Sequence, residues 1–165
     1  MIELLQRLES EDPDEVLDAL MDAWRLTADP RLTKAIRPLL SHQDGEIRAW
    51  AMKVLGARWV QPGTEAIARK MMYDDACPLA RAAALRAVSS FHRDTSNLAL
   101  SQEFYAIAKD PDGAPECRAS ALWAVLSVMG VPLQHWPRPT GSLDITGDTD
   151  WDFFDSVVRG DREPT

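Results

Sequence analysis

Residues 46–56, Glu-Ile-Arg-Ala-Trp-Ala-Met-Lys-Val-Leu-Gly, contain the pattern that decides the fold. Small or apolar residues follow Arg48 after three, six and seven positions, which places them on one face of an α-helix. The same spacing follows Arg81 and Arg118, which come 33 and 37 residues after the previous arginine of the series. The nine positions are Ala51, Val54, Leu55, Ala84, Ala87, Val88, Ala121, Ala124 and Val125. Self-similarity at this period predicts stacked helix pairs, and the alanines let neighbouring helices approach closely.

An aspartate precedes each arginine of the series, at Asp44, Asp75 and Asp112. We expect each to start its helix as a cap or as an anion in the first turn. Each could also pair with the arginine of an adjacent repeat, and an exposed pair of this kind contributes about 0–1 kcal/mol.

Together these residues resemble the HEAT-repeat family over residues 30–130. Gly56 stands where that motif often ends, whereas Ser89 and Leu126 depart from it. The resemblance implies an all-α, right-handed α-solenoid of about 3.5 HEAT-like helix pairs, with an irregular C-terminal strap and a short final helix. It is specific for the fold and nearly silent on function. The alternative is a generic helical bundle whose alanines are coincidental.

The turn signals divide the chain into a repeat domain at 1–130, a Pro/Gly-rich linker at 131–147 and an acidic aromatic tail at 148–165. We expect Pro38 to kink its helix or end it early, and Thr95 or Ser96 to cap a later helix. The expected helices cover residues 2–10, 14–26, 30–41, 45–59, 64–73, 78–92, 97–109, 115–129 and a short stretch from 148 to 158.

The charge distribution is uneven around a net charge of −8. Residues 1–30 carry −7, residues 31–140 carry +4 and residues 141–165 carry −5. A dedicated nucleic-acid binder would carry a basic stripe, so this distribution argues against one. Without an apolar run of 18 residues or a signal pattern, we expect no membrane partner and a cytoplasmic location. The two cysteines are then expected to be reduced.

No catalytic constellation is recognisable. The histidines, at 42, 92 and 135, are isolated, and there is no Cys-x-x-Cys pair and no Gly-rich phosphate loop. We therefore expect no catalytic residues, no cofactor and no metal, and a protein that is not an enzyme.

The second helices of the repeats would present an outward ridge at 50, 53, 57, at 83, 86, 90 and at 120, 123, 127. Four of these residues, Trp50, Lys53, Arg86 and Trp123, belong to the types that dominate binding hot spots, and we expect them to bind a partner. The alternative is that the Trp rings pack over neighbouring helices or under the C-terminal strap. Trp24 and Trp59 are expected in or near the core.

The tail places Trp151, Phe154 and Val158 on one face of a short helix. It could dock on the protein's own groove, with its acids meeting Lys53 and Arg86, or present its rings to a partner. Its candidate partner-binding residues are Trp151, Phe153, Phe154, Asp150, Asp152 and Asp155.

These features favour a non-enzymatic module that binds another protein, as a monomer or weak dimer. A small, acidic HEAT-like protein resembles the immunity proteins that neutralise bacterial toxins, which implies occlusion of a partner's active site by a curved face. In that hypothesis the tail acids imitate an anionic substrate. The alternatives are a scaffold or adaptor that grips a peptide or helix, and a HEAT-like enzyme or lyase-type chaperone.

Overall fold

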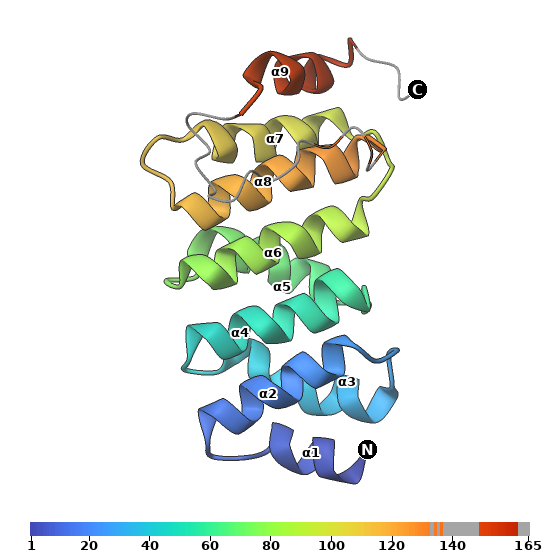
Figure 1. Ribbon diagram of the computed structural model, residues 1–165, viewed down its shortest axis with the longest axis vertical. Helices are drawn as coiled ribbons and strands as arrows, with labels where there is room; N and C mark the ends of the chain where they lie inside the picture. The colour runs from blue at the N-terminus through green and yellow to red at the C-terminus, as the bar shows by residue number, and fades with distance from the viewer. Residues whose placement is uncertain (133, 135, 137–148, 162–165) are drawn as a thin grey trace. The chain divides into compact units, whose positions relative to one another are not determined.

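The computed structural model describes residues 1–132, 134, 136 and 149–161, and within these residues the secondary structure is helical, with no strand (Figure 1). The predicted all-α class is therefore confirmed. The helices are α1 (Ile2–Leu8), α2 (Pro13–Trp24), α3 (Pro30–Ile36), η1 (Arg37–Ser41), α4 (Gly45–Met52), η2 (Lys53–Arg58), α5 (Thr64–Asp74), α6 (Pro78–Phe91), α7 (Leu98–Lys109), α8 (Pro115–Val128) and α9 (Trp151–Arg159).

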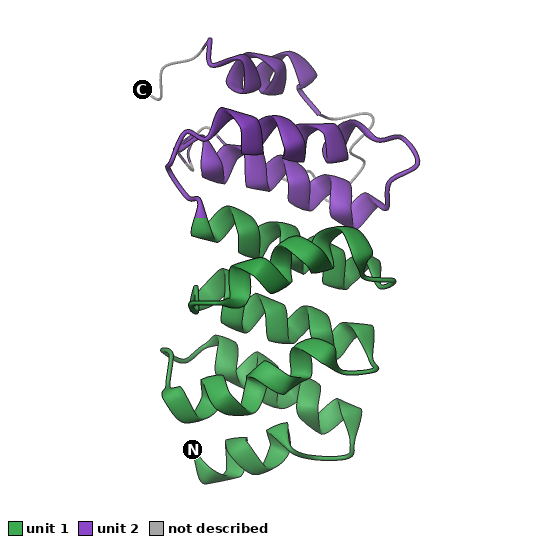
Figure 2. Cartoon of the chain, turned by 180° about the vertical axis from the view of Figure 1, so that it is seen from behind, with its two compact units in different colours: residues 1–91 green, residues 92–165 purple. Residues whose placement is uncertain are grey.

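The chain forms two compact units, residues 1–91 and 92–165 (Figure 2). The predicted linker at 131–147 lies almost entirely outside the described residues. Among the described helices, none combines the length and the apolar character that a membrane crossing requires.

In unit 1 the helices pack as successive pairs. α1 packs on α2, η1 on α4 and α5 on α6, while α2 contacts α4 and α4 contacts α6 (Figure 1). The nine positions predicted to face inward all have 0% exposure, six of them in unit 1 and three on α8 of unit 2. The alanine-containing face is therefore the packed face, as the spacing after each arginine predicted.

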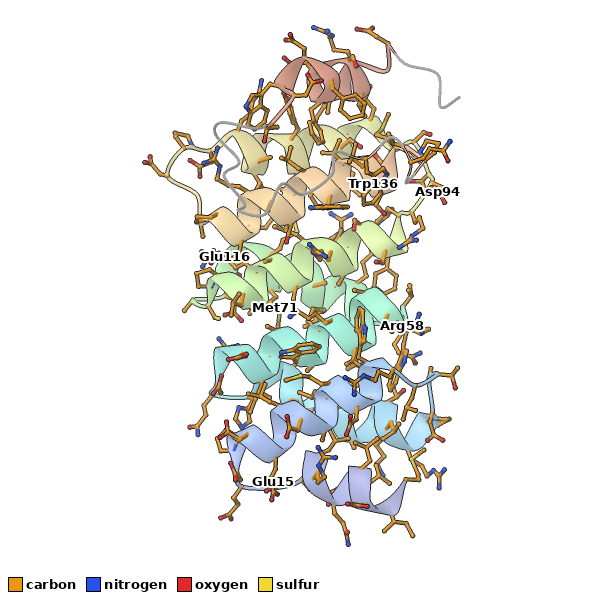
Figure 3. All side chains as sticks on the ribbon, viewed as in Figure 1. Glu15, Arg58, Met71, Asp94, Glu116 and Trp136 are labelled. Carbon is orange, nitrogen blue, oxygen red and sulfur yellow. The ribbon has the colours of Figure 1, made fainter. Side chains whose placement is uncertain are left out.

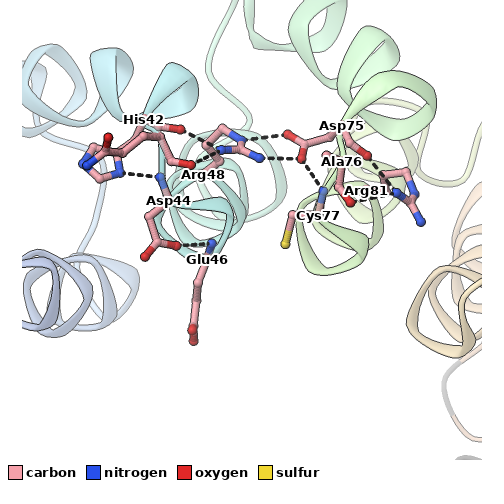
Figure 4. A network of polar contacts seen from close by, with 9 residues as sticks. His42, Asp44, Glu46, Arg48, Asp75, Ala76, Cys77 and Arg81 are labelled. Carbon is pink, nitrogen blue, oxygen red and sulfur yellow. Dashed lines mark hydrogen bonds and ion pairs between the residues drawn. The ribbon is translucent and has the colours of Figure 1, made fainter.

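Arg48 and Arg81 occupy equivalent places in unit 1. Each donates from Nη1 to the main-chain oxygens six and five residues earlier, namely to His42 and Gln43 and to Asp75 and Ala76 (Figure 4). Each arginine thus binds the main chain of the turn that precedes its own helix. The repeated sequence predicts this equivalence. Arg118, in unit 2, instead donates from Nε to the oxygen of Ala108.

Arg48 also binds the carboxylate of Asp75, which belongs to the next pair (Figure 4). Its Nε and Nη2 donate to the two carboxylate oxygens at 2.8 and 2.7 Å, and the two side chains are 17% and 8% exposed. The Arg48 guanidinium lowers the pKa of Asp75. Burial acts in the opposite direction, and the hydrogen bond that the Cys77 amide donates to the carboxylate lowers the pKa further. The expected pairing between an Asp and the Arg of an adjacent repeat is therefore confirmed here, in a largely buried form.

Two expected helices are interrupted. The α-helix that starts at Pro30 ends at Ile36, and a 3₁₀ segment carries Pro38, as a proline inside a helix predicts. The helix expected over 45–59 changes at Lys53 into the wider π-helical turns of η2. Gly56 lies in η2 against α6, and a Cβ added there would be 2.5 Å from the Cβ of Ala87. This close approach explains why glycine stands at the position.

Aspartate caps start several helices. Asp44 accepts the amide two residues ahead, as expected, and Asp29 does the same at the start of α3. The prediction for Thr95 or Ser96 is wrong, because the Asn97 side chain accepts the Leu100 amide and caps α7. Asp112 does not cap α8, which starts after Ala114 without a side-chain cap.

Unit 2 consists of α7 and α8 packed as a pair, with α9 against both. Residues 94 and 96 donate their amides to the oxygens of Ser127 and Val128, which ties the segment before α7 to the end of α8. α9 starts at Trp151 rather than at residue 148 and buries Phe154, Val157 and Val158. The tail helix therefore completes the core of its own unit.

Candidate protein-binding surface

The candidate surface in unit 1 starts with Trp50 and Lys53, one turn apart along α4 and η2. Both side chains are half-buried, and the Lys53 Nζ lies 4.0 Å from the centroid of the Trp50 ring. A cation over the face of an indole is attracted by the ring electrons, at about 0.5–1 kcal/mol where water still has access. The contact holds an aromatic surface and a positive charge side by side.

Arg86 adds a second cation from α6, the helix packed on α4 and η2. Desolvation lowers the pKa of Lys53, and the neighbouring Arg86 lowers it further, while Glu46 acts in the opposite direction. Arg86 is exposed on its outer side, yet the surrounding helices desolvate the guanidinium enough to lower its pKa as well. Trp50, Lys53 and Arg86 are hereafter called the cation–indole cluster. The cluster brings an aromatic ring and two partly desolvated cations together on unit 1.

The outward ridge is narrower than expected. Ala83 is 1% exposed and Ser120 is 5% exposed, so the first ridge position of the second and third copies is buried. The reason is that α6 and α8 each have neighbours on more than one side, which widens the buried arc beyond a single helix face.

Trp123, on α8 of unit 2, is half-buried under another ring. The centroids of Trp123 and Trp136 are 4.7 Å apart, with the planes inclined at 56°. The Trp136 Nε1 donates to the oxygen of Val131 at 2.6 Å, which fixes its ring beside α8 (Figure 3). Trp123 is therefore covered by Trp136, which agrees with the alternative that its ring packs under the C-terminal strap.

The tail acid Asp155 has partners on α7. The Tyr105 hydroxyl donates to its carboxylate, and the Lys109 Nζ lies 3.1 Å from the same oxygen. These two hydrogen bonds lower the pKa of Asp155. Lys109 also lies 4.6 Å from the Tyr105 centroid and 5.5 Å from that of Trp151. The tail helix is therefore docked, but on α7 and α8 of its own unit, and Asp155 meets Lys109 rather than Lys53 or Arg86 as docking in the groove predicted.

The other tail residues have different environments. Asp150 accepts the Phe153 amide and caps α9, so its carboxylate has a structural task. Asp152 is exposed, Phe153 is half-buried against the ring of Phe154, and Phe154 itself is 2% exposed. In this docked state Asp152 and Phe153 can meet a partner, whereas Phe154 holds α9 in place.

An aromatic surface at one end of unit 1 does not follow from the sequence patterns. Trp24, expected in or near the core, is 37% exposed at the last position of α2. Trp59 is half-buried at the end of η2, and its Nε1 donates to the oxygen of Leu26. The sequence feature that could have predicted this exposure is the position of Trp24 at the end of its helix, where a side chain is no longer held on the buried face.

Within the described residues, no three His, Cys, Asp or Glu side chains gather closely enough to hold a metal ion. Comparisons with family models, curated proteins and solved structures found no match to the chain.

Proposed function

We propose that this protein is a non-enzymatic, protein-binding module built as a HEAT-like α-solenoid, and that it acts by covering a functional site of its partner. The support for the solenoid is the stepwise packing of α2, α4 and α6, together with equivalent bonding by Arg48 and Arg81. The resemblance to immunity proteins supplies the class of partner, a toxin domain.

The observation that carries the proposal is the cation–indole cluster. Trp50, Lys53 and Arg86 come from packed helices of one unit, so their relative positions are fixed before any partner arrives. A rigid aromatic ring beside two partly desolvated cations is the composition of a binding hot spot. A partner that brings a carboxylate and an apolar side chain would contact both the cations and the ring of the cluster.

Of the three tail acids proposed to imitate an anionic substrate, two have structural partners. Because Asp150 caps α9 and Asp155 is bound by Tyr105 and Lys109, Asp152 is the tail acid placed to imitate an anionic substrate. Replacing Asp152 with Asn should slow association with the partner, most clearly at low salt. An unchanged association rate would remove mimicry by the tail from the proposal.

The test of the main proposal is affinity capture followed by mass spectrometry, with wild type compared to the variant Trp50→Ala, Lys53→Ala, Arg86→Ala. The matched control is Ile67→Ala with Lys70→Ala, which removes exposed apolar and cationic groups from α5. We expect a partner that wild type and control retain and the cluster variant loses, and whose activity falls when wild type is added. Equal capture by all three proteins, or a partner with undiminished activity, would contradict the proposal.

A further inference from the structure

A second surface lies at one end of unit 1, where the loop after α2 meets the end of η2. Trp24, Leu26 and Val60 are 37%, 40% and 37% exposed there. The Arg58 Nε donates to the oxygen of Trp24 at 3.3 Å, and the Trp59 Nε1 donates to the oxygen of Leu26 at 3.0 Å; Arg58 is labelled at this end of η2 in Figure 3. These bonds join the two loops and hold their exposed apolar residues at the same end of unit 1.

The backbone at Val60 is strained. Its φ of +49° lies in the left-handed region, which a β-branched residue rarely adopts. The Gln61 amide donates to the oxygen of Leu55 at 2.8 Å, so Val60 occupies the position after a helix where glycine is usual. Because Val60 is substantially exposed, burial explains only part of its presence there. Strain that the fold does not require is characteristic of binding sites.

An open groove of about 690 Å³ adjoins this surface. Its lining includes Ala28, two residues after Leu26, and Gln61, the residue after Val60. Pro30 and Pro38 form part of its apolar wall, and Lys34 and Arg37 bring positive charge to it. The Arg37 Nη2 donates to the oxygen of Pro62 at 3.3 Å, which links η1 to the turn after Val60.

The charge at this end is opposite to that of the whole chain. Residues 22–37 contain four bases and two acids, in a protein of net charge −8. Each acid is bound by a base: the Arg25 Nη1 lies 3.1 Å from the Asp22 carboxylate, and the Arg31 Nη2 lies 3.2 Å from that of Asp29, which lines the groove. The groove and the adjoining loops therefore present aliphatic and aromatic surface together with the positive charges of Lys34 and Arg37.

We infer that this surface, formed by Trp24, Leu26, Val60 and the groove beside Pro38, binds an acidic peptide segment of another protein that carries apolar anchor residues. The apolar anchors would cover Trp24, Leu26 and Val60, and the acids would meet Lys34 and Arg37. A nucleic acid is the less suitable polyanion, because the net charge of −8 on the chain repels it. The site is separate from the cation–indole cluster and does not depend on the function proposed for it.

The test uses a displayed library of random 12-residue peptides selected against the full-length protein. We expect the enriched peptides to combine Asp or Glu with Leu, Phe or Trp, and to bind less tightly as salt is raised. Trp24→Ala should weaken binding about tenfold or more, as expected for a Trp anchor. Lys34→Gln with Arg37→Gln should weaken binding and flatten its dependence on salt.

Val60→Gly separates binding from folding. Glycine adopts φ of +49° without strain, so this variant should melt at or above the wild-type temperature while binding the enriched peptides several times more weakly. Ile67→Ala with Lys70→Gln on α5, and the variant of the cation–indole cluster, should bind the peptides as wild type does. The inference is overturned if no acidic and apolar sequences are enriched, if Val60→Gly and Trp24→Ala retain full affinity, or if a labelled single-stranded oligonucleotide binds more tightly than the peptides.

Discussion

Gly56→Ala tests the close packing of η2 on α6. The added Cβ would lie 2.5 Å from the Ala87 Cβ and 2.8 Å from the Met52 Sδ. The Met52 sulfur belongs to a flexible side chain and can move, but the Ala87 Cβ is fixed to its helix. Because ordinary contact begins near 3.4 Å, the two backbones must separate by about 1 Å. Overpacking of this kind costs about 1–3 kcal/mol, and we expect the upper end because Val54, Leu55 and Ala87 have no exposed surface.

Helix propensity acts in the opposite direction, since Ala is favoured over Gly by about 1 kcal/mol in a helix. The net loss expected for Gly56→Ala is therefore about 2 kcal/mol, measured by urea unfolding with far-UV circular dichroism at unchanged m value. Ala87→Gly alone removes one buried methyl and the propensity of Ala, which together also cost about 2 kcal/mol.

The double variant Gly56→Ala with Ala87→Gly decides the matter. It moves the methyl group from one helix to the other and removes the clash, so its stability should return to within about 1 kcal/mol of wild type. Ala66→Gly is the control, because Ala66 lies on the exposed side of α5 and its replacement changes only the helix propensity. A neutral or stabilising Gly56→Ala, or a double variant that loses about 4 kcal/mol as the sum of the two singles, would refute the argument.

Three further predictions concern other contacts. Asp75→Asn should cost about 2–3 kcal/mol at pH 7, because Arg48 loses its counter-ion while keeping its main-chain acceptors. Folding lowers the pKa of Asp75 from 3.8, so the stability that this carboxylate contributes is complete above that pH and is lost as the pH falls through the folded pKa. In urea unfolding across the acid range, the stability of Asp75→Asn should therefore fall less steeply with pH than that of wild type. Parallel stability curves for the two proteins would contradict this. Ser101→Ala should raise the stability of unit 2 by about 1 kcal/mol, because it removes a buried hydroxyl without a partner among the described residues; a lower melting temperature would count against it. Phe154→Ala should release α9, and the emission of Trp151 should shift to the red relative to the exposed-site control Asp152→Asn; identical spectra would show that α9 stays docked.

The sequence predicted the parts of the fold that depend on helical periodicity. The buried alanines after Arg48, Arg81 and Arg118 follow from spacing alone, and the break at Pro38 follows from the missing amide of proline. The change to π-helical turns at Lys53 does not follow, because it depends on how η2 fits against α6 in three dimensions.

The candidate sites were less predictable. Trp50, Lys53 and Arg86 could be placed near one another because they occupy one ridge of the repeat. Val60 could not, since sequence rules assign left-handed backbone to glycine and the nearby Gly63 already satisfies that expectation. The partners of Asp155 depend on where α9 docks, which neither its charge nor its periodicity specifies.

The double attachment of Arg48 has a consequence for how unit 1 comes apart. The same guanidinium closes the turn at His42 in one pair and holds Asp75 in the next, so neither pair can fray without releasing a charge shared with its neighbour. Such a shared residue suppresses partly melted forms and favours all-or-none opening of the two pairs. Native-state hydrogen exchange should then find the amides of 45–52 and 78–91 opening together, with one common free energy.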